Sequence, residues 1–299
     1  MDTKHLWRTG LSSDSRRSPI YVSIASLASV GLAGAVGLLA LVVILAFREA
    51  RALEVVRESL HVPNLPAGLE GATLVFLADI HAGPLFGAAR MAHLVERVNE
   101  LRADVIVLGG DYVGGKRGGA DVFYPAAAGL VANRGVFAVL GNHDWWEGAD
   151  DARRRMAESG ITLLENSSAR IAFGDAVLAI AGLSDEWTAT PDIVATSAGI
   201  EPRDVAVLVS HNPDSFADAL PATPGVWTLA LAGHTHGGQI AGVYRLNPHK
   251  PTHYGKRYLS RGLFEDNGIP IIVSYGVGAV ALPLRFFARP EIHHITLTR

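Results

Sequence analysis

The chain has 299 residues, of which 49% are hydrophobic, and its formal net charge is −3. It contains no cysteine, which excludes thiolate zinc sites, disulfides and thiol catalysis. It has no block of basic residues, so we expect no nucleic-acid partner. The length suffices for one sizeable α/β domain with an appendage.

The first predicted element is a membrane-spanning helix over residues 20–47. This segment has no charged residue, and as a helix it exceeds the roughly 30 Å of a bilayer's hydrocarbon core. A cleaved signal peptide, with Ala50-Arg51-Ala52 as its cleavage site, is the alternative, but its apolar region would span only about 7–15 residues. We therefore divide the chain into a cytoplasmic tail (1–19), a transmembrane helix (20–47), a connector (48–70) and a main domain (71–299).

The charges beside this helix predict its orientation. Four basic residues precede it and three follow it before residue 70, which favours a cytoplasmic N-terminus and a main domain outside the cytoplasm. Ser15-Arg16-Arg17 also resembles a twin-arginine export signal, although Ser18-Pro19-Ile20 departs from its usual apolar continuation. Paired arginines before a membrane helix also serve as simple topology anchors.

Small residues recur at every fourth position of the same segment, at Ala25, Ser29, Ala33 and Gly37. Such a face lets two membrane helices approach closely, which makes a homodimer through this helix one hypothesis. Membrane helices are rich in small residues in any case, so the pattern is not specific.

After the connector, strand-like and helix-like segments alternate. We expect strands at 74–78, 105–108 and 136–140, and helices at 88–101, 120–132 and 149–159. This alternation predicts right-handed βαβ crossovers in a layered α/β domain. A hairpin (169–173 and 177–181) and further strands at 205–210, 227–231, 271–274 and 292–297 predict a second sheet packed on the first.

Five predicted strands are followed directly by side chains that can bind a metal ion. The motifs are Asp79-Ile80-His81, Gly110-Asp111, Gly141-Asn142-His143-Asp144, Ser210-His211-Asn212 and Gly233-His234-Thr235-His236. Ligand crevices form at the carboxyl ends of strands in α/β domains, and residues two apart in a strand point the same way. Each motif alone has a purely structural explanation, such as a turn residue or a helix cap. Together they predict a composite site of histidine, carboxylate and amide ligands, which suits manganese, iron or zinc.

The order of these motifs resembles that of the calcineurin-like metallophosphoesterase superfamily. The extended form Gly-His-Thr-His-Gly-Gly-Gln, ending at Gln239, is similar to its membrane-anchored bacterial branch. The resemblance runs from about residue 71 to the C-terminus. It implies a four-layer α/β/β/α sandwich of two packed mixed sheets, and a single-pass protein of the bacterial cytoplasmic (inner) membrane.

The resemblance also implies two divalent metal ions that share one carboxylate. The ligands of the first ion would be Asp79, His81, Asp111 and His236. The ligands of the second ion would be Asp111, Asn142, His211 and His234. Two cations about 3.5–4 Å apart can lower the pKa of a bridging water and clamp a phosphoryl group for in-line attack.

The same resemblance gives catalytic roles to two further residues. His143 would bind no metal; it would face the substrate and protonate the leaving oxygen. Asp144 would orient the His143 ring by accepting its N–H. Three aromatic residues next to the motifs, Tyr112, Trp145 and Trp146, either wall the cleft or pack around it.

Two other segments have simpler interpretations. Residues 114–119 are glycine-rich but lack the Lys-Ser/Thr pattern of a P-loop, and we interpret them as a flexible loop near the cleft. His293 and His294 lie in the last predicted strand and are interpreted as packing or edge residues.

The sequence thus predicts a membrane-anchored dimetal phosphohydrolase that cleaves a phosphoester or pyrophosphate bond through a metal-bridging hydroxide. The substrate would be a phosphorylated small molecule or lipid, and anchored relatives imply a lipid-linked one such as UDP-2,3-diacylglucosamine. That reaction needs a cytoplasmic-face site, which conflicts with the expected topology; an exported domain favours phosphodiesters of the cell envelope. The alternative is a non-catalytic membrane protein that uses the metal site for structure or recognition.

Overall fold

The computed structural model describes residues 24–115, 118–240, 252 and 263–299. The chain divides into two compact units, Met1–Val42 and Val43–Arg299. Helix α1 (Ile24–Glu49) begins in the first unit and ends in the second. Its segment Gly31–Glu49 is long and apolar enough to cross a membrane. The predicted tail, residues 1–19, lies outside the described residues.

The second unit contains two six-stranded mixed sheets. The first sheet has the order β1-β12-β2-β3-β4-β5, in which β2 to β5 are parallel and β12 runs antiparallel to β2. Its strands are β1 (Glu54–His61), β2 (Thr73–Leu77), β3 (Val105–Leu108), β4 (Val136–Ala138), β5 (Thr162–Leu163) and β12 (Glu291–Thr298).

The second sheet has the order β10-β11-β9-β8-β7-β6. Its inner strands β7, β8, β9 and β11 are parallel, and the outer strands β6 and β10 run antiparallel to their neighbours. Its strands are β6 (Ser167–Phe173), β7 (Ala176–Gly182), β8 (Val205–Ser210), β9 (Leu229–Ala232), β10 (Leu263–Asp266) and β11 (Ile269–Val273).

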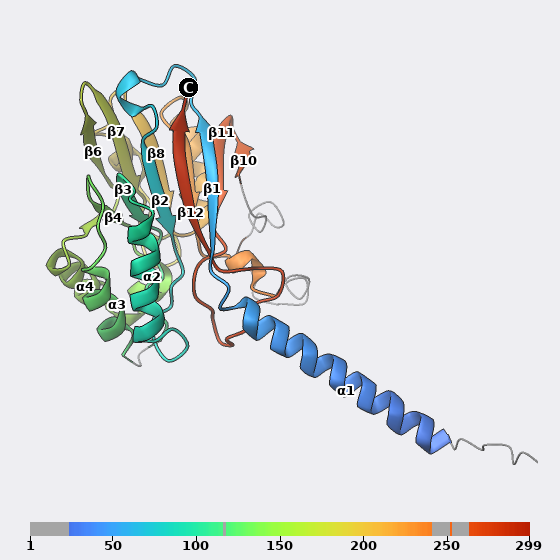
Figure 1. Ribbon diagram of the computed structural model, residues 1–299. Coiled ribbons are helices and arrows are strands. Elements are labelled where there is room, and N and C mark those ends of the chain that lie inside the picture. The colour runs from blue at the N-terminus through green and yellow to red at the C-terminus, as the bar shows by residue number, and fades with distance from the viewer. Residues whose placement is uncertain (1–23, 116–117, 241–251, 253–262) are drawn as a thin grey trace, which may run out of the picture. The chain divides into compact units, whose positions relative to one another are not determined.

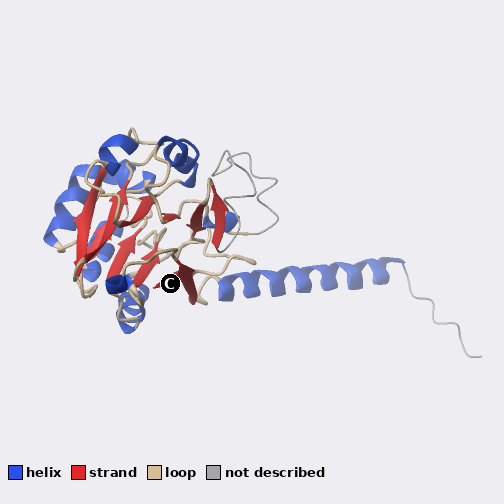
Figure 2. Ribbon diagram, turned by 90° about the horizontal axis from the view of Figure 1, so that it is seen from above, coloured by secondary structure: helices blue, strands red, loops and turns tan. Residues whose placement is uncertain are grey.

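Helices cover the outer face of each sheet, so the predicted four-layer sandwich is confirmed (Figures 1 and 2). The first sheet carries α2 (Ala88–Glu100), α3 (Gly119–Ala127) and α4 (Asn142–Glu158). The second sheet carries α5 (Ile193–Ser197) and α6 (Phe216–Ala222). Short 3-10 helices lie at η1 (Ala67–Leu69), η2 (Pro213–Ser215) and η3 (His236–Gly238).

The two-residue period of the strands distributes the core between the layers. In β2, Leu74 and Phe76 pack between the sheets, whereas Val75 and Leu77 pack under the helices. Because both faces of these central strands are buried, their sequences are continuously apolar rather than alternating. This arrangement fixes the strand ends, from which the functional loops emerge.

The predicted connector and one predicted helix differ from the structure. The segment predicted as a connector, 48–70, contains β1, which pairs in parallel with β12. We did not predict β1 as a strand because its sequence contains charged residues, which an edge strand tolerates on its exposed side. The helix predicted at 149–159 is the second part of α4, which begins at Asn142 and is interrupted at Gly148, where φ is 135°. Asn142 and His143 therefore lie in the first turn of a helix.

Candidate metal centre

The predicted ligands emerge from the carboxyl ends of five parallel strands. Asp79 and His81 follow β2, Asp111 follows β3, and Asn142 follows β4 in the first sheet. The second sheet contributes His211 after β8, and His234 and His236 after β9. All of these side chains are buried, with exposures of 8% or less. The facing edges of the two sheets thus bring the seven residues to one place.

The local backbone that presents these side chains is strained. Five of the candidate ligands have positive φ angles between 47° and 69°: Asp79, His81, Asp111, His234 and His236. Non-glycine residues rarely adopt this left-handed conformation, and when they do the surrounding structure imposes it, most often at functional sites. Asp79 and His81 therefore point the same way because of a turn, and not because of the strand alternation that we had expected.

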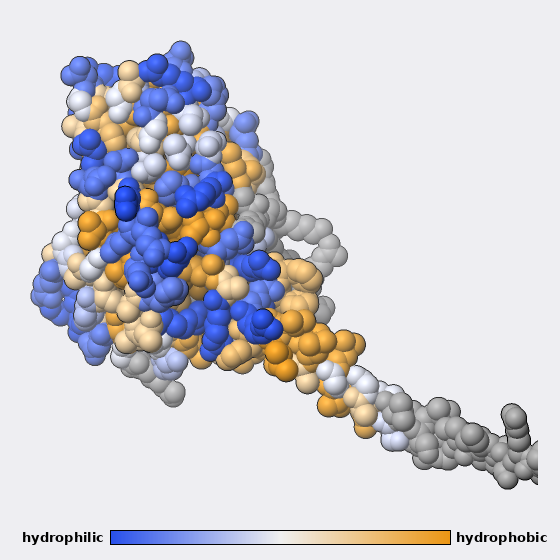
Figure 3. Space-filling view, in the orientation of Figure 1, coloured by the Kyte–Doolittle hydropathy of each residue, from blue (hydrophilic) through white to orange (hydrophobic). Residues whose placement is uncertain are grey.

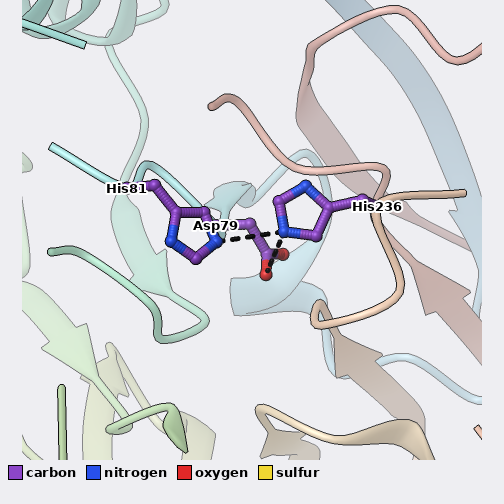
Figure 4. A group of neighbouring side chains, drawn as sticks. All are labelled: Asp79, His81 and His236. Carbon is purple, nitrogen blue, oxygen red and sulfur yellow. Dashed lines mark hydrogen bonds and ion pairs between the residues drawn. The ribbon is translucent and has the colours of Figure 1, made fainter. Parts of the chain in front are cut away.

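The first group of converging donors is Asp79, His81 and His236 (Figure 4). The Nε2 atoms of His81 and His236 lie 3.0 Å apart, and His236 Nε2 lies 3.4 Å from Asp79 Oδ1. Two nitrogens that each lie about 2.0–2.1 Å from one ion are themselves roughly 3 Å or slightly more apart. The spacing of these three donors is therefore that of ligands around one cation.

The second group is Asp111, His211 and His234. His211 Nε2 lies 3.3 Å from Asp111 Oδ2 and 3.1 Å from His234 Nδ1. The other nitrogen of the His211 ring, Nδ1, lies 2.8 Å from the carbonyl oxygen of Gly109 and donates to it, because a carbonyl can only accept. That bond orients the ring and turns its other nitrogen, Nε2, toward Asp111.

Asp111 lies between the two groups. Its Oδ2 is 3.6 Å from His81 Nε2 on one side and 3.3 Å from His211 Nε2 on the other. Its Oδ1 accepts a hydrogen bond of 2.9 Å from the main-chain N–H of His143. One carboxylate with donors on both sides is the arrangement that a shared ligand requires.

Burial keeps three of the imidazoles neutral. It lowers the pKa of His81 to about 4, that of His234 to about 3, and that of His236 well below its ordinary value. At pH 7 these rings are uncharged, and each offers a lone pair. Neutral imidazole is the form that binds a metal ion.

His211 and Asp111 behave as a charged pair. Burial alone lowers the pKa of His211, but the adjacent Asp111 carboxylate outweighs it and raises that pKa. Burial likewise raises the pKa of Asp111, and the charge and hydrogen bond of His211 outweigh it and lower that pKa. Burial raises the pKa of Asp79 to about 7, against the lowering effect of His211. A cation at this position would stabilise both carboxylates in their ionised form.

The donors fit divalent cations. The Asn142 Oδ1 and His234 Nε2 atoms are buried, and within the described residues neither has a hydrogen-bond partner. A buried polar atom without a partner costs about 1–3 kcal/mol, and a bound cation would remove that cost for the amide oxygen. The donor set contains only nitrogen and oxygen, which agrees with the predicted manganese, iron or zinc.

His143 lies beside His81 and Asp111, and the three side chains form a third group of close donors. Its ring is 4.8 Å, centroid to centroid, from that of His81 and meets it edge-on, and it lies 5.0 Å from the ring of Trp146. His143 is only partly buried, and Trp146 is 55% exposed. His143 is therefore placed between the buried donors and solvent, where a substrate would approach.

Asp144 makes contacts other than the expected one with the His143 ring. Its Oδ2 accepts from the main-chain N–H groups of Asp111 (2.8 Å) and Gly141 (2.9 Å), and its Oδ1 accepts from that of Tyr112 (2.9 Å). Among the described residues the Asp144 carboxylate therefore binds only backbone amides. Its side chain ties the loop after β3 to the first turn of α4, and so sets Asp111 against Asn142.

The other aromatic residues near the motifs have separate roles. Tyr112 is fully buried, stacks on Phe123 with centroids 4.7 Å apart, and donates from its hydroxyl to the carbonyl oxygen of Leu108, so it packs and does not wall the cleft. Trp145 is partly buried against the core under α4. Of the glycine-rich segment, residues 116 and 117 lie outside the described residues.

Sequence reasoning missed three residues around the site. Trp187 packs edge-on against His234 with ring centroids 4.5 Å apart. Asp185 is buried, and burial raises its pKa while His211 lowers it. Both follow the apolar strand β7, which is the same signal that revealed the five motifs. The third, Arg285, is fully buried with Nη2 3.2 Å from His236 Nδ1, and no local pattern indicated it.

Comparison with known proteins gives a consistent result. A family model described as calcineurin-like phosphoesterase matches residues 72–238. The uncharacterized metallophosphoesterase YkuE of Bacillus subtilis is 30% identical over 259 residues, covering 84% of this chain and 87% of that protein. Phosphodiesterase YaeI of Escherichia coli is 30% identical over 228 residues, covering 75% of this chain and 81% of that protein.

A eukaryotic relative is labelled as a membrane protein. The transmembrane protein with metallophosphoesterase domain of Danio rerio is 27% identical over 273 residues, covering 83% of this chain. The match covers 58% of the length of the zebrafish protein. The shared part is therefore little more than half of that relative.

Proposed function

The chain belongs to the calcineurin-like phosphoesterase family, and from this membership we propose that it is a membrane-anchored hydrolase of phosphoester or pyrophosphate bonds that works with two divalent cations. The observation that carries the proposal is the position of Asp111, whose Oδ2 lies within 3.6 Å of His81 and 3.3 Å of His211. One carboxylate with a donor group on each side supports a pair of ions rather than one.

Two overlapping sets of side chains would hold the ions. The first set is Asp79, His81, Asp111 and His236. The second set is Asp111, Asn142, His211 and His234. When bound, such a pair of cations polarises the phosphoryl group and activates water for in-line attack.

The residues of the chain itself would complete the chemistry. His143, at the solvent side of His81, is placed to donate a proton to the leaving oxygen and to stabilise charge on the phosphoryl group. Asp144 would hold the first turn of α4, which carries His143, against the loop after β3 by accepting hydrogen bonds from the main-chain N–H groups of Asp111 and Gly141. Asp144 is thus a positioning residue in this proposal.

The apolar helix supports a location at a membrane. Gly31–Glu49 is long enough to span one, and relatives from zebrafish and cattle are labelled transmembrane. We propose a single pass in a bacterial cytoplasmic membrane with the domain outside the cytoplasm, and an envelope phosphodiester or lipid-linked phosphate as the substrate. Protease accessibility in intact and lysed spheroplasts tests the side, since an exported domain is cleaved in intact spheroplasts.

Turnover of a chromogenic phosphodiester, bis(p-nitrophenyl) phosphate, with Mn²⁺ tests the hydrolase. We expect His143→Ala to lose about 10²–10⁴-fold in kcat while it retains its metal, because a general acid contributes that much. The control is His61→Ala, which alters an exposed histidine on β1. Bound metal without turnover in the wild type would instead support a non-catalytic protein that uses the metals for structure or recognition.

A further inference from the structure

A pocket of about 280 Å³ lies beside the end of helix α1 and is separate from the metal centre. Its two arginines are Arg51, just after α1, and Arg90, on α2. The remaining wall is largely apolar and includes Leu53, Phe86, Leu94, Val277 and Pro290. The pocket therefore combines positive charge with an apolar wall, as a ligand with an anionic head and an apolar tail requires.

The two arginines have no carboxylate partner in the described part of the chain. Arg90 donates to the carbonyl oxygens of Leu85 and Ala50, each at 3.0 Å, and its guanidinium lies 4.3 Å from the centroid of the Phe86 ring. Arg51 donates to the carbonyl oxygen of Phe47. Its guanidinium lies 3.5 Å from the centroid of the Phe47 ring.

The electrostatic environment of Arg90 favours an anion. Burial, and next the like charge of Arg51, lower the pKa of Arg90. Glu49, the acid at the end of α1, accepts instead from the main-chain N–H of Ala288 at 2.9 Å. An anion between the guanidiniums would remove their repulsion and accept charge-assisted hydrogen bonds.

The end of the apolar span indicates the depth of Arg51 relative to a bilayer. That span ends at Glu49, and Arg90 is bonded to Ala50, the next residue. If the span crosses a bilayer, residues just beyond it lie among the headgroups, whichever face the domain occupies. Arg51, two residues beyond the span, would therefore lie at the depth of the lipid phosphates, and it lines the pocket.

A loop at the same end of the domain adds exposed apolar side chains. Its main chain is held to α1 by a 3.0 Å hydrogen bond from Arg285 N to Ala46 O. The side chains of Leu282 and Phe287 in this loop are 55% and 74% exposed. Figure 3 shows apolar surface where the helix joins the domain. Exposed aromatic and aliphatic groups beside a membrane helix are typical of a surface that contacts lipid.

We propose that this pocket binds one anionic phospholipid of the bilayer, with the phosphate between Arg51 and Arg90 and the first part of an acyl chain against Leu53, Phe86 and Val277. The proposal rests on the membrane anchoring of the proposed function but not on hydrolysis. The bound lipid would hold the domain against the bilayer. One wall residue, Val277, donates its main-chain N–H to the carbonyl oxygen of Ala78 at 3.0 Å, and Ala78 precedes the candidate ligand Asp79.

The test is native mass spectrometry of the full-length protein in mild detergent, titrated with dioleoylphosphatidylglycerol or dioleoylphosphatidylcholine. We expect the wild type to bind the anionic lipid at least about tenfold more tightly. The double variant Arg51→Gln/Arg90→Gln should lose that preference. Ala89→Trp, which fills the pocket and keeps both charges, should weaken binding of the anionic lipid by a similar factor.

The matched control is Arg97→Gln, which removes an exposed charge from the same helix and should bind lipid as the wild type does. All variants should hydrolyse bis(p-nitrophenyl) phosphate at the wild-type rate, so a failure of the hydrolase proposal would be seen separately. An unchanged lipid preference in the double variant, or unchanged binding in Ala89→Trp, would overturn the inference. Displacement of the lipid by equimolar glycerol 3-phosphate would also overturn it, since the apolar wall would then add nothing.

Discussion

The Nε2 atoms of His81 and His236 lie 3.0 Å apart, although the two residues are separated by 155 positions in the chain. Both rings are buried and neutral at pH 7 because burial lowers their pKa values. Asp79 brings a carboxylate oxygen to 3.4 Å from the same His236 nitrogen. Loops from two different sheets thus hold two imidazole nitrogens and a carboxylate oxygen together, an arrangement that a shared cation would stabilise.

Asp111→Ala should remove both ions, whereas His236→Ala should weaken only the first. Asp111 is the one candidate ligand with donors on both sides, so its loss leaves each group short of a charged ligand. We expect turnover to fall by at least about 10²-fold in Asp111→Ala. The measurement is the metal-to-protein ratio by inductively coupled plasma mass spectrometry. Asp175→Ala, at an exposed turn, is the control, and an Asp111 variant that keeps its full metal content would contradict the shared-ligand model.

Asp144→Ala should lower the free energy of unfolding by at least about 2 kcal/mol. The substitution leaves the main-chain N–H groups of Asp111, Tyr112 and Gly141 buried without an acceptor, and each such group costs about 1–3 kcal/mol. Urea denaturation measures the loss. The control, Asp150→Ala, removes an exposed carboxylate from the same helix and should change stability by less than about 0.5 kcal/mol. A loss of activity without any loss of stability would point instead to direct catalysis by Asp144.

The sequence indicated which side chains the structure brings together, but not the local geometry that presents them. Polar residues after apolar strands indicated Asp79, Asp111 and His211 because the carboxyl ends of parallel strands meet at one edge. The left-handed φ angles of Asp79 and Asp111 could not be predicted, because tertiary contacts impose them against local preference. The same limit applies to Asp144, because three of the four main-chain N–H groups that its carboxylate binds lie more than 30 positions away in the chain.

Other errors have different physical causes. The edge strand β1 looked like a connector because its half-buried side chains include charged residues. Arg285 was missed because a single arginine in a loop gives no periodic signal, although it is fully buried next to His236. A side chain that acts through long-range contacts produces no regular pattern in the sequence, whereas the end of an apolar strand can be recognised from it.

Gly110→Ala should destabilise the protein and weaken metal binding. Gly110 has a φ of +93°, and a Cβ there would lie 2.6 Å from His211 Nδ1 and 2.7 Å from Gly141 N. The methyl group would have to displace a candidate ligand and the start of α4. Gly225→Ala is the matched control: its φ is +76°, and within the described residues no atom lies within 4 Å of the added Cβ. It should cost only the backbone strain of about 1 kcal/mol. Equal losses in the two variants, measured by thermal unfolding, would contradict the steric explanation.

His293 should make the stability of the fold depend on pH above neutrality. Its ring lies 3.0 Å from Glu291 Oε1 and 3.3 Å from Glu58 Oε2. Burial lowers the pKa of His293, but these carboxylates outweigh it and raise that pKa from 6.5 to about 9. A pKa raised by folding means that the stabilisation is complete below about pH 6.5 and is lost as the pH rises through about 9.

The raised pKa of His293 corresponds to about 3 kcal/mol of folding free energy, since one pKa unit is about 1.4 kcal/mol. The measurement is the difference in unfolding free energy between the wild type and His293→Gln at intervals from pH 6 to 9.5, which should shrink as the pH rises. His294→Gln is the neighbouring control: the pKa of His294 is lowered, chiefly by burial, so its contribution should not change above pH 7. A wild-type advantage over His293→Gln that stays constant to pH 9.5 would mean that the ring is neutral in the folded protein. The His293 ring could then donate a hydrogen bond to only one of the two carboxylates, because neutral imidazole carries a single N–H.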